Sequence, residues 1–307
     1  MKWRKLGRVF SADGQRPWMQ SHCSMPYAEP LQNGRHRVWF TPRDGANRSH
    51  LGWLEIDLAE PLTILAMAET PTLAPGPPGS FDETGAMGSW LVTAGVERRH
   101  YYIGWSQSAR DPFHIAIGLA TGRADTDEGA GTGFNRSGDA PIFDHSAADP
   151  IFVSTPCVLK DGANWRMWYL SATRWRGTPP RPDYNIRHAV SPDGITWTPD
   201  GVVIDFAHPG ECAIARPCVV RDGATWRMWY CYRGDDFAYR LGYAESPDSR
   251  HWTRRDDRAG LTVSDSGWDS EMIAYPYVFD HIGGRYMLYA GNGFGQAGMG
   301  LAVLEAD

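Results

Sequence analysis

The chain has 307 residues with 34 glycines, 22 prolines and 12% aromatic residues, a composition typical of many short strands and tight turns rather than long helices. Its formal net charge of −6 provides no excess of positive charge for a phosphate backbone or an anionic membrane surface, so we expect neither nucleic acid nor a membrane as a partner. No apolar run approaches the roughly 18 residues of a membrane span, and no apolar signal segment follows the basic N-terminus, so we expect a cytoplasmic protein.

The predicted elements begin with a short strand at residues 3–10 and continue through two diverged copies of a repeating unit. The first copy contains predicted strands at residues 37–40 and 51–57, and the second contains them at 89–93 and 99–105. Turn-forming Gly, Asn and Pro residues separate these runs, as expected between antiparallel strands.

The third and fourth copies share nearly the same sequence. Residues 155–169 read TPCVLKDGANWRMWY and residues 216–230 read RPCVVRDGATWRMWY, while residues 275–289 form a looser fifth copy, YPYVFDHIGGRYMLY. In each copy an Asp-Gly or Gly-Gly turn joins two apolar runs, which predicts a β-hairpin. Such units recurring at a spacing of roughly 40–60 residues are typical of a β-propeller.

The fifth copy ends before its fourth strand. Residues 3–10 match residues 197–204, the fourth strand of copy three, in the positions of Trp and Gly and in the apolar end. We expect residues 3–10 to pair with the last strand of the chain and to leave no open edge there. The sequence therefore predicts an all-β fold, a five-bladed β-propeller of four-stranded antiparallel blades in a single domain over residues 1–307, with the N-terminal strand closing the last blade.

A functional site is expected on one face of this propeller. In a four-stranded meander the start of strand one and the loop between strands two and three lie on the same face, so these segments of five blades line one funnel. The substrate-binding candidates at those positions are His22, Arg43, Asp44, Arg48, Glu83, Thr155, Trp175, Arg216, Arg233, Tyr275 and Asn292.

Carboxylates at the same rim indicate glycoside chemistry, which needs one protonated acid and one ionised base or nucleophile. The catalytic candidates are Glu211, Asp149 and Glu271. Glu211 is the strongest, because it opens the best-formed copy, has Arg216 nearby in sequence and has no turn signature of its own.

Neither histidines nor cysteines indicate a metal. His188 and His251 lie in or beside predicted strands without partners at ligand spacing. Cys157 and Cys218 occupy the same place in two copies, where packing explains them best. We therefore expect no cofactor and no metal.

Several short motifs carry a resemblance to a known family. Asp149-Pro150, the Glu211-Cys212 start of copy four and the Ser-Pro-Asp-Gly-x-x-Trp turn at residues 191–197 resemble the five-bladed β-propeller glycosidases of glycoside hydrolase families 32, 43, 62 and 68, and more loosely the family 130 phosphorylases. The chain is most similar to uncharacterised bacterial family 43-like proteins. The resemblance implies that Asp149 is the aspartate that tunes the acid and that Glu211 is the acid. The family's third carboxylate, an aspartate opening blade one, has no match, because residues 20–26 read QSHCSMP.

Three functions remain open. The first is a glycosidase-like enzyme that acts on a saccharide or activated sugar in the central funnel, with a relocated base such as Asp44, Glu83 or Glu271. The second is a phosphorylase, or an enzyme on a phosphorylated or nucleotide sugar, in which rim arginines hold the phosphate. The third is a non-catalytic carbohydrate-binding propeller. We expect the first, with a small carbohydrate or sugar phosphate as the partner.

Overall fold

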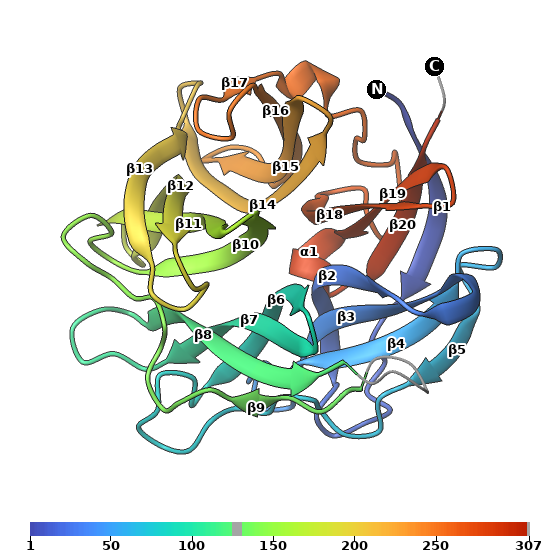
Figure 1. Ribbon diagram of the computed structural model, residues 1–307, viewed down its shortest axis with the longest axis horizontal. Helices are drawn as coiled ribbons and strands as arrows, with labels where there is room; N and C mark the ends of the chain where they lie inside the picture. The colour runs from blue at the N-terminus through green and yellow to red at the C-terminus, as the bar shows by residue number, and fades with distance from the viewer. Residues whose placement is uncertain (125–130, 306–307) are drawn as a thin grey trace.

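The computed structural model describes residues 1–124 and 131–305, and it shows five four-stranded blades around a common axis (Figure 1). Blades one to four take their strands in chain order, and blade five combines β18–β20 with β1. The strands are β1 (Trp3–Phe10); β2 (Ser21–Pro30), β3 (Arg35–Arg43), β4 (Gly52–Asp57) and β5 (Ile64–Met67) in blade one; β6 (Gly85–Ala94), β7 (Glu97–Ser106), β8 (His114–Arg123) and β9 (Asn135–Arg136) in blade two; β10 (Val153–Asp161), β11 (Asn164–Arg176), β12 (Arg181–Ser191) and β13 (Thr198–Ile204) in blade three; β14 (Glu211–Asp222), β15 (Thr225–Gly234), β16 (Arg240–Ser246) and β17 (Thr253–Arg254) in blade four; and β18 (Ala274–His281), β19 (Gly284–Ala290) and β20 (Met299–Leu304) in blade five.

Helix is scarce, as the composition predicts. The described residues form one four-residue helix, α1 (Asn292–Gly295), and two 3-10 turns, η1 (Gln32–Gly34) and η2 (Asp256–Arg258). None of these has the length and apolar character needed to cross a bilayer. The predicted all-β propeller is confirmed.

The N-terminal strand completes the last blade, as predicted. β1 pairs antiparallel with β20, from Trp3 opposite Leu304 to Phe10 opposite Met299, and the two strands lie side by side in Figure 1. Trp3 is buried and donates its indole N–H to the carbonyl of Ala259 at 3.1 Å. The first and last strands of the chain therefore share one sheet and one core.

The repeated turns form tight hairpins because glycine takes a positive φ in each. In blades three and four the first turn residue is Gly162 or Gly223, with φ of 64° and 59°. That position requires glycine in a type II′ turn. In blade five both turn residues, Ile282 and Gly283, have positive φ, which corresponds to type I′.

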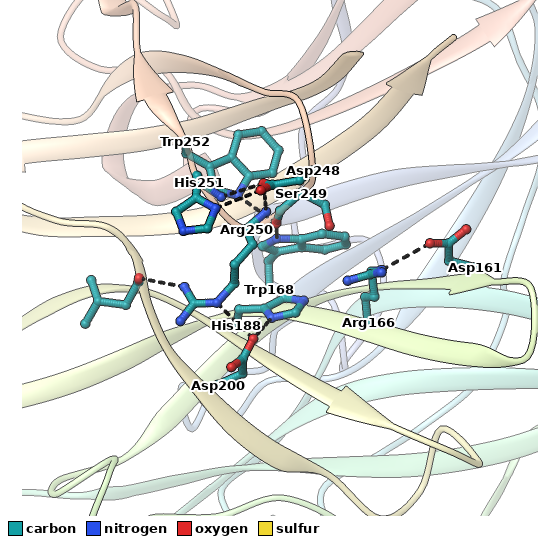
Figure 2. A network of polar contacts seen from close by, with 11 residues as sticks. Asp161, Arg166, Trp168, His188, Asp200, Asp248, Ser249, Arg250, His251 and Trp252 are labelled. Carbon is teal, nitrogen blue, oxygen red and sulfur yellow. Dashed lines mark hydrogen bonds and ion pairs between the residues drawn. The ribbon is translucent and has the colours of Figure 1, made fainter. Parts of the chain in front are cut away.

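A polar network joins blades three and four at the end opposite the predicted funnel (Figure 2). The indoles of Trp168 and Trp252 both donate to the carbonyl of Ser249, at 3.1 and 2.9 Å. Arg250, next in the chain, pairs with Asp200 of β13 at 2.9 Å. Trp168 is fully buried, so the repeated Trp-Tyr positions serve blade packing, as expected.

The two histidines set aside as metal ligands lie in this same network. His188 pairs with Asp200 at 2.9 Å and His251 with Asp248 at 2.7 Å. Asp248 also accepts backbone N–H groups of its own turn, from residues 250 and 251. The Ser-Pro-Asp turns are therefore structural.

The innermost strand of each blade carries a bulge that turns one residue toward the axis. Register shifts occur at the same point in all five first strands. In four blades the bulged residue has a positive φ, between 45° and 57°, and a proline follows it. A bulge of this kind re-aims a side chain without ending the ladder. The four axial residues are Met25, Thr155, Arg216 and Tyr275.

Candidate functional site

A cavity of about 320 Å³ lies at the centre of the ring and receives side chains from all five blades. Three of the four axial residues line it. The full lining is Ser24, Met25, Arg43, Met87, Ile103, Trp105, Phe113, Ile115, Phe152, Ser154, Thr155, Leu170, Pro182, Tyr184, Ala215, Arg233, Tyr239, Tyr275 and Phe294. The cavity is thus mostly apolar, with a small number of polar groups, as is usual for small-molecule sites.

One wall of the cavity is aromatic. Phe113 stands between Trp105 and Phe152, with ring centroids 4.8 and 5.6 Å away. Trp175 closes this cluster from behind, 5.1 Å from Phe113, and its indole donates to Asp111 at 2.9 Å. A flat apolar wall of this kind suits the face of a ring.

The facing wall is cationic and phenolic. The Arg233 guanidinium lies 5.9 Å from the ring of Tyr184 and 5.6 Å from that of Tyr239, and the two tyrosine hydroxyls hydrogen-bond each other. Burial lowers the pKa of Arg233, but the neighbouring tyrosines outweigh it and the pKa is raised. Burial lowers the pKa of Arg43, the second arginine of the lining. Arg233 Nε is buried without a hydrogen-bond partner among the described residues.

The described residues that line this cavity include no Asp, Glu, His or Cys. Glu211, Asp149 and Glu271, which were expected to meet at one mouth, are therefore not part of this lining. Each of the three residues makes other contacts, which are described in turn below.

Glu211 is held in an ion pair. Its side chain is fully buried, both carboxylate oxygens accept from Arg254 of β17 at 2.8 Å, and one also accepts the backbone N–H of Ala207 at 2.7 Å. Burial alone raises the pKa of Glu211, but these hydrogen bonds outweigh it and the pKa is lowered. A general acid of a glycosidase needs a raised pKa. The geometry supports a structural role for Glu211.

Asp149 belongs to a contact that three blades repeat. In each, a buried aspartate before strand one accepts the hydroxyl of a tyrosine on strand two, 20 residues later, at 3.1 Å. We call this contact the Asp–Tyr clamp; its members are Asp82–Tyr102, Asp149–Tyr169 and Asp269–Tyr289. A cation lies beside each aspartate: Arg136, Arg187 and Lys5, respectively. A contact repeated in three blades is typical of a structural group, and it accounts for the burial of Asp149.

Blade four has a variant of the clamp, and Glu211 is part of it. Tyr230 donates to Asp256 at 2.5 Å, and Arg254 joins Asp256 to Glu211. Arg254 lies on the fourth strand of its blade, as Arg136 and Lys5 do in theirs. Glu211 therefore completes a structural ion pair between the first and last strands of blade four.

Glu271 and two further polar candidates fix loops. Glu271 is exposed, and its backbone N–H donates to Asn292 Oδ1 at 2.8 Å. The Glu83 carboxylate accepts the N–H of Gly79 at 2.8 Å. None of these three residues lines the cavity.

Three candidates from blade one, Asp44, Arg48 and His22, are outside the cavity lining. Asp44 accepts from Arg48 and His50, at 2.9 and 3.1 Å. His22 hydrogen-bonds the Ser21 hydroxyl at 2.8 Å. Burial and then the charge of nearby Arg43 lower the pKa of His22 to about 4, so this imidazole is neutral at physiological pH.

Arg216 points into the core beneath the cavity. It is fully buried, and Nη1 donates to the carbonyl and hydroxyl of Ser89 at 2.7 and 2.9 Å. Its guanidinium also lies 5.6 Å from the ring of Trp90. Arg43, Thr155, Arg233 and Tyr275 are thus the sequence candidates that line the cavity.

Sequence reasoning missed the aromatic lining at the third strands. Phe113 precedes β8, Tyr239 precedes β16, and Tyr184 lies near the start of β12. The recurrence of an aromatic residue near the start of the third strand in three blades could have predicted this lining. The recurrence is hard to see in the sequence, because the loops before these strands differ in length.

The pH dependence of stability tests the structural role of Glu211. Because the folded-state pKa is lowered, this carboxylate contributes stability that is present above its ordinary pKa, 4.5, and is lost as the pH falls through the folded value. Glu211→Gln is therefore expected to cost about 1.5–3 kcal/mol at pH 7 and less at pH 3. Urea unfolding of both proteins at the two pH values measures this, and an equal difference at both would contradict it.

No protein-family model matches the chain. Two curated relatives are each 42% identical over 307 residues, covering 99% of this chain and 100% of their own length. They are "Uncharacterized protein MT1551" of Mycobacterium tuberculosis (strain CDC 1551 / Oshkosh) and "Uncharacterized protein Rv1502" of Mycobacterium tuberculosis (strain ATCC 25618 / H37Rv).

Solved structures share the fold at lower identity. A glycoside hydrolase superimposes with a TM-score of 0.77 at 18% identity, covering 99% of this chain and 92% of its own. A glycosyl hydrolase from Bacteroides ovatus gives 0.70 at 14%, with 99% and 93% covered, and a thermostable family-43 glycoside hydrolase gives 0.68 at 13%, with 94% and 91% covered. The chain therefore belongs to the family of the two Mycobacterium tuberculosis proteins and has the β-propeller fold of glycoside hydrolases.

Proposed function

We propose that the protein is a glycosidase-like propeller that binds a sugar carrying an anionic group, a phosphate or a carboxylate, in its central cavity. The proposal rests on the charge of the cavity lining. Among the described residues, those that line the cavity include two arginines and no carboxylate. The glycoside hydrolase fold supports a carbohydrate as the ligand, and the arginines support its negative charge.

Arg233 is the residue best placed to hold the anion. Its Nε lacks a partner among the described residues, and a buried donor left unpaired costs about 1–3 kcal/mol, which an anionic ligand would recover. Guanidinium groups bind phosphate and carboxylate through paired N–H donors. Arg43, from blade one, adds a second positive charge to the same lining.

The rest of the cavity suits the sugar ring. The aromatic wall of Trp105, Phe113 and Phe152 offers flat apolar surface, and hydroxyls of Ser154 and Thr155 offer hydrogen bonds. The phenolic hydroxyls of Tyr184, Tyr239 and Tyr275 add further hydrogen-bonding groups to the same lining.

Calorimetric titration with matched sugars tests the proposal. Glucose 1-phosphate, glucose 6-phosphate and glucuronate are compared with glucose, and inorganic phosphate serves as the probe for the anion alone. We expect at least one charged sugar to bind more tightly than glucose, and Arg233→Leu to weaken that binding by about 10–100-fold, the loss of a charge-assisted hydrogen bond. Arg43→Leu is expected to weaken it as well.

Arg174→Leu is the matched control, because the Arg174 side chain is 71% exposed, pairs with Asp183 at 2.6 Å and is outside the cavity lining. Equal affinity for charged and neutral sugars, or charged-sugar binding that survives both Arg43→Leu and Arg233→Leu, would overturn the proposal.

A further inference from the structure

Two histidines and an aspartate converge at the start of blade two's third strand. His114 is the first residue of β8, and Asp144 and His145 lie on the connection between blades two and three. Asp144 Oδ1 is 3.1 Å from His114 Nε2 and 3.0 Å from His145 Nδ1. The three side chains are outside the lining of the central cavity.

We propose that His114, Asp144 and His145 form a Zn²⁺ site. The three ligand atoms, one from each side chain, lie within 4.8 Å of one another. Zn²⁺ binds imidazole nitrogen and carboxylate oxygen at about 2.0–2.2 Å, so tetrahedral ligands are about 3.3 Å apart. The two separations from Asp144 already match that spacing, and small side-chain rotations would admit the ion. This inference departs from the sequence-based expectation of no metal.

The site has room for a fourth ligand. A hollow of about 500 Å³ borders both histidines and is otherwise lined by Ser106, Gln107, Ser108, Ala109, Arg110, Asp111, Pro150 and Ile151. Three protein ligands with an open fourth position are typical of zinc sites that bind water or a substrate, whereas structural sites are closed by four. Asp111 adds a second negative charge near His114, which favours a dication.

Two other places in the described structure bring a histidine close to a carboxylate, and each lacks one feature that a metal site needs. His208, Glu211 and Asp256 also lie within 4.8 Å, but the Arg254 guanidinium already pairs with both carboxylates and takes the place of a cation. His251 pairs with Asp248, yet among the described residues this pair belongs to no group of three potential ligands.

Protons compete with the metal. Zn²⁺ requires the neutral imidazole of each histidine ligand, so binding is expected to weaken as the pH falls.

Titration with Zn²⁺ alone, after chelator treatment and dialysis of the full chain, tests the site. We expect one ion per chain, and His145→Ala or Asp144→Asn should weaken binding by more than the roughly 10–100-fold that loss of an outer-shell partner costs. Co²⁺ gives a second readout: a tetrahedral absorption band that is present in the unaltered protein and absent in His145→Ala.

Two controls separate this site from adventitious binding. His251→Ala removes an exposed histidine from a His–Asp pair and should leave Zn²⁺ affinity unchanged, as should His208→Ala. Thermal unfolding of each protein without metal checks the fold. Zn²⁺ affinity that is the same in His145→Ala and the unaltered protein, or that is lost in His208→Ala instead, would overturn the proposal.

Discussion

Deleting residues 1–10 is expected to abolish the cooperative unfolding transition, a loss on the scale of the whole stability of a domain, about 5–15 kcal/mol. β1 supplies the outer strand of blade five, so its removal leaves β20 as an open edge. It also removes Trp3, which packs edge-on against Trp229 with ring centroids 6.1 Å apart. Urea unfolding followed by tryptophan fluorescence and circular dichroism measures the effect.

The control for this deletion is Arg4→Ala. The Arg4 side chain is 60% exposed and contacts Glu305 at 3.9 Å, so the change is expected to stay within about 0.5 kcal/mol. A peptide of residues 1–10 added to the shortened chain should restore part of the transition. A shortened protein that unfolds as sharply, and at the same urea concentration, as the full chain would show that β1 is dispensable.

Arg254→Met is expected to lower the free energy of unfolding by about 3–5 kcal/mol at pH 7, because it leaves the carboxylates of Glu211 and Asp256 without their shared cation. Methionine keeps much of the side-chain volume, so the lost charge dominates. Burial favours the protonated form of Glu211, and in the variant Arg254 no longer opposes it. The deficit is therefore expected to be smaller at pH 4, where protonation removes part of the unpaired charge, than at pH 7.

Arg258→Met provides the matched comparison within the same blade. Arg258 pairs with Glu245 at 3.2 Å, but the two side chains are 45% and 28% exposed. Loss of such a surface pair costs at most about 1 kcal/mol. Similar losses from the two substitutions, or an Arg254→Met deficit that does not change with pH, would argue against a stabilising buried ion pair at Glu211.

The sequence predicts the propeller well because its signals are local. The Asp-Gly turn at Gly162 and Gly223 and the alternating large residues after it act within one hairpin, and β1 shows the same spacing as β13. Strand ends were underestimated: the first strand of blade two was expected at residues 89–93 and extends over Gly85–Ala94. Most of the missing residues precede the bulge, which interrupts the alternation.

The site was predicted less well, because a carboxylate's role depends on partners far away in the chain. Glu211 meets Arg254 across 43 residues, and Asp269 meets Lys5 across 264. No residue near Glu211 in the sequence indicates that Arg254 is its partner. Arg216, the neighbour that was expected, is buried in the core instead. One signal was readable: an Asp followed 20 residues later by Tyr recurs in three blades, as at Asp149 and Tyr169.

The axial bulges have a consequence for how such a scaffold changes its chemistry. At Met25, Thr155, Arg216 and Tyr275 the backbone has a positive φ, and a proline follows each residue. A substitution at any of these positions changes a side chain near the axis of the ring and leaves the residues of the hairpin turns unchanged. The surface of the cavity can therefore change through single substitutions at Met25, Thr155 or Tyr275, which line it and lie outside every hairpin turn.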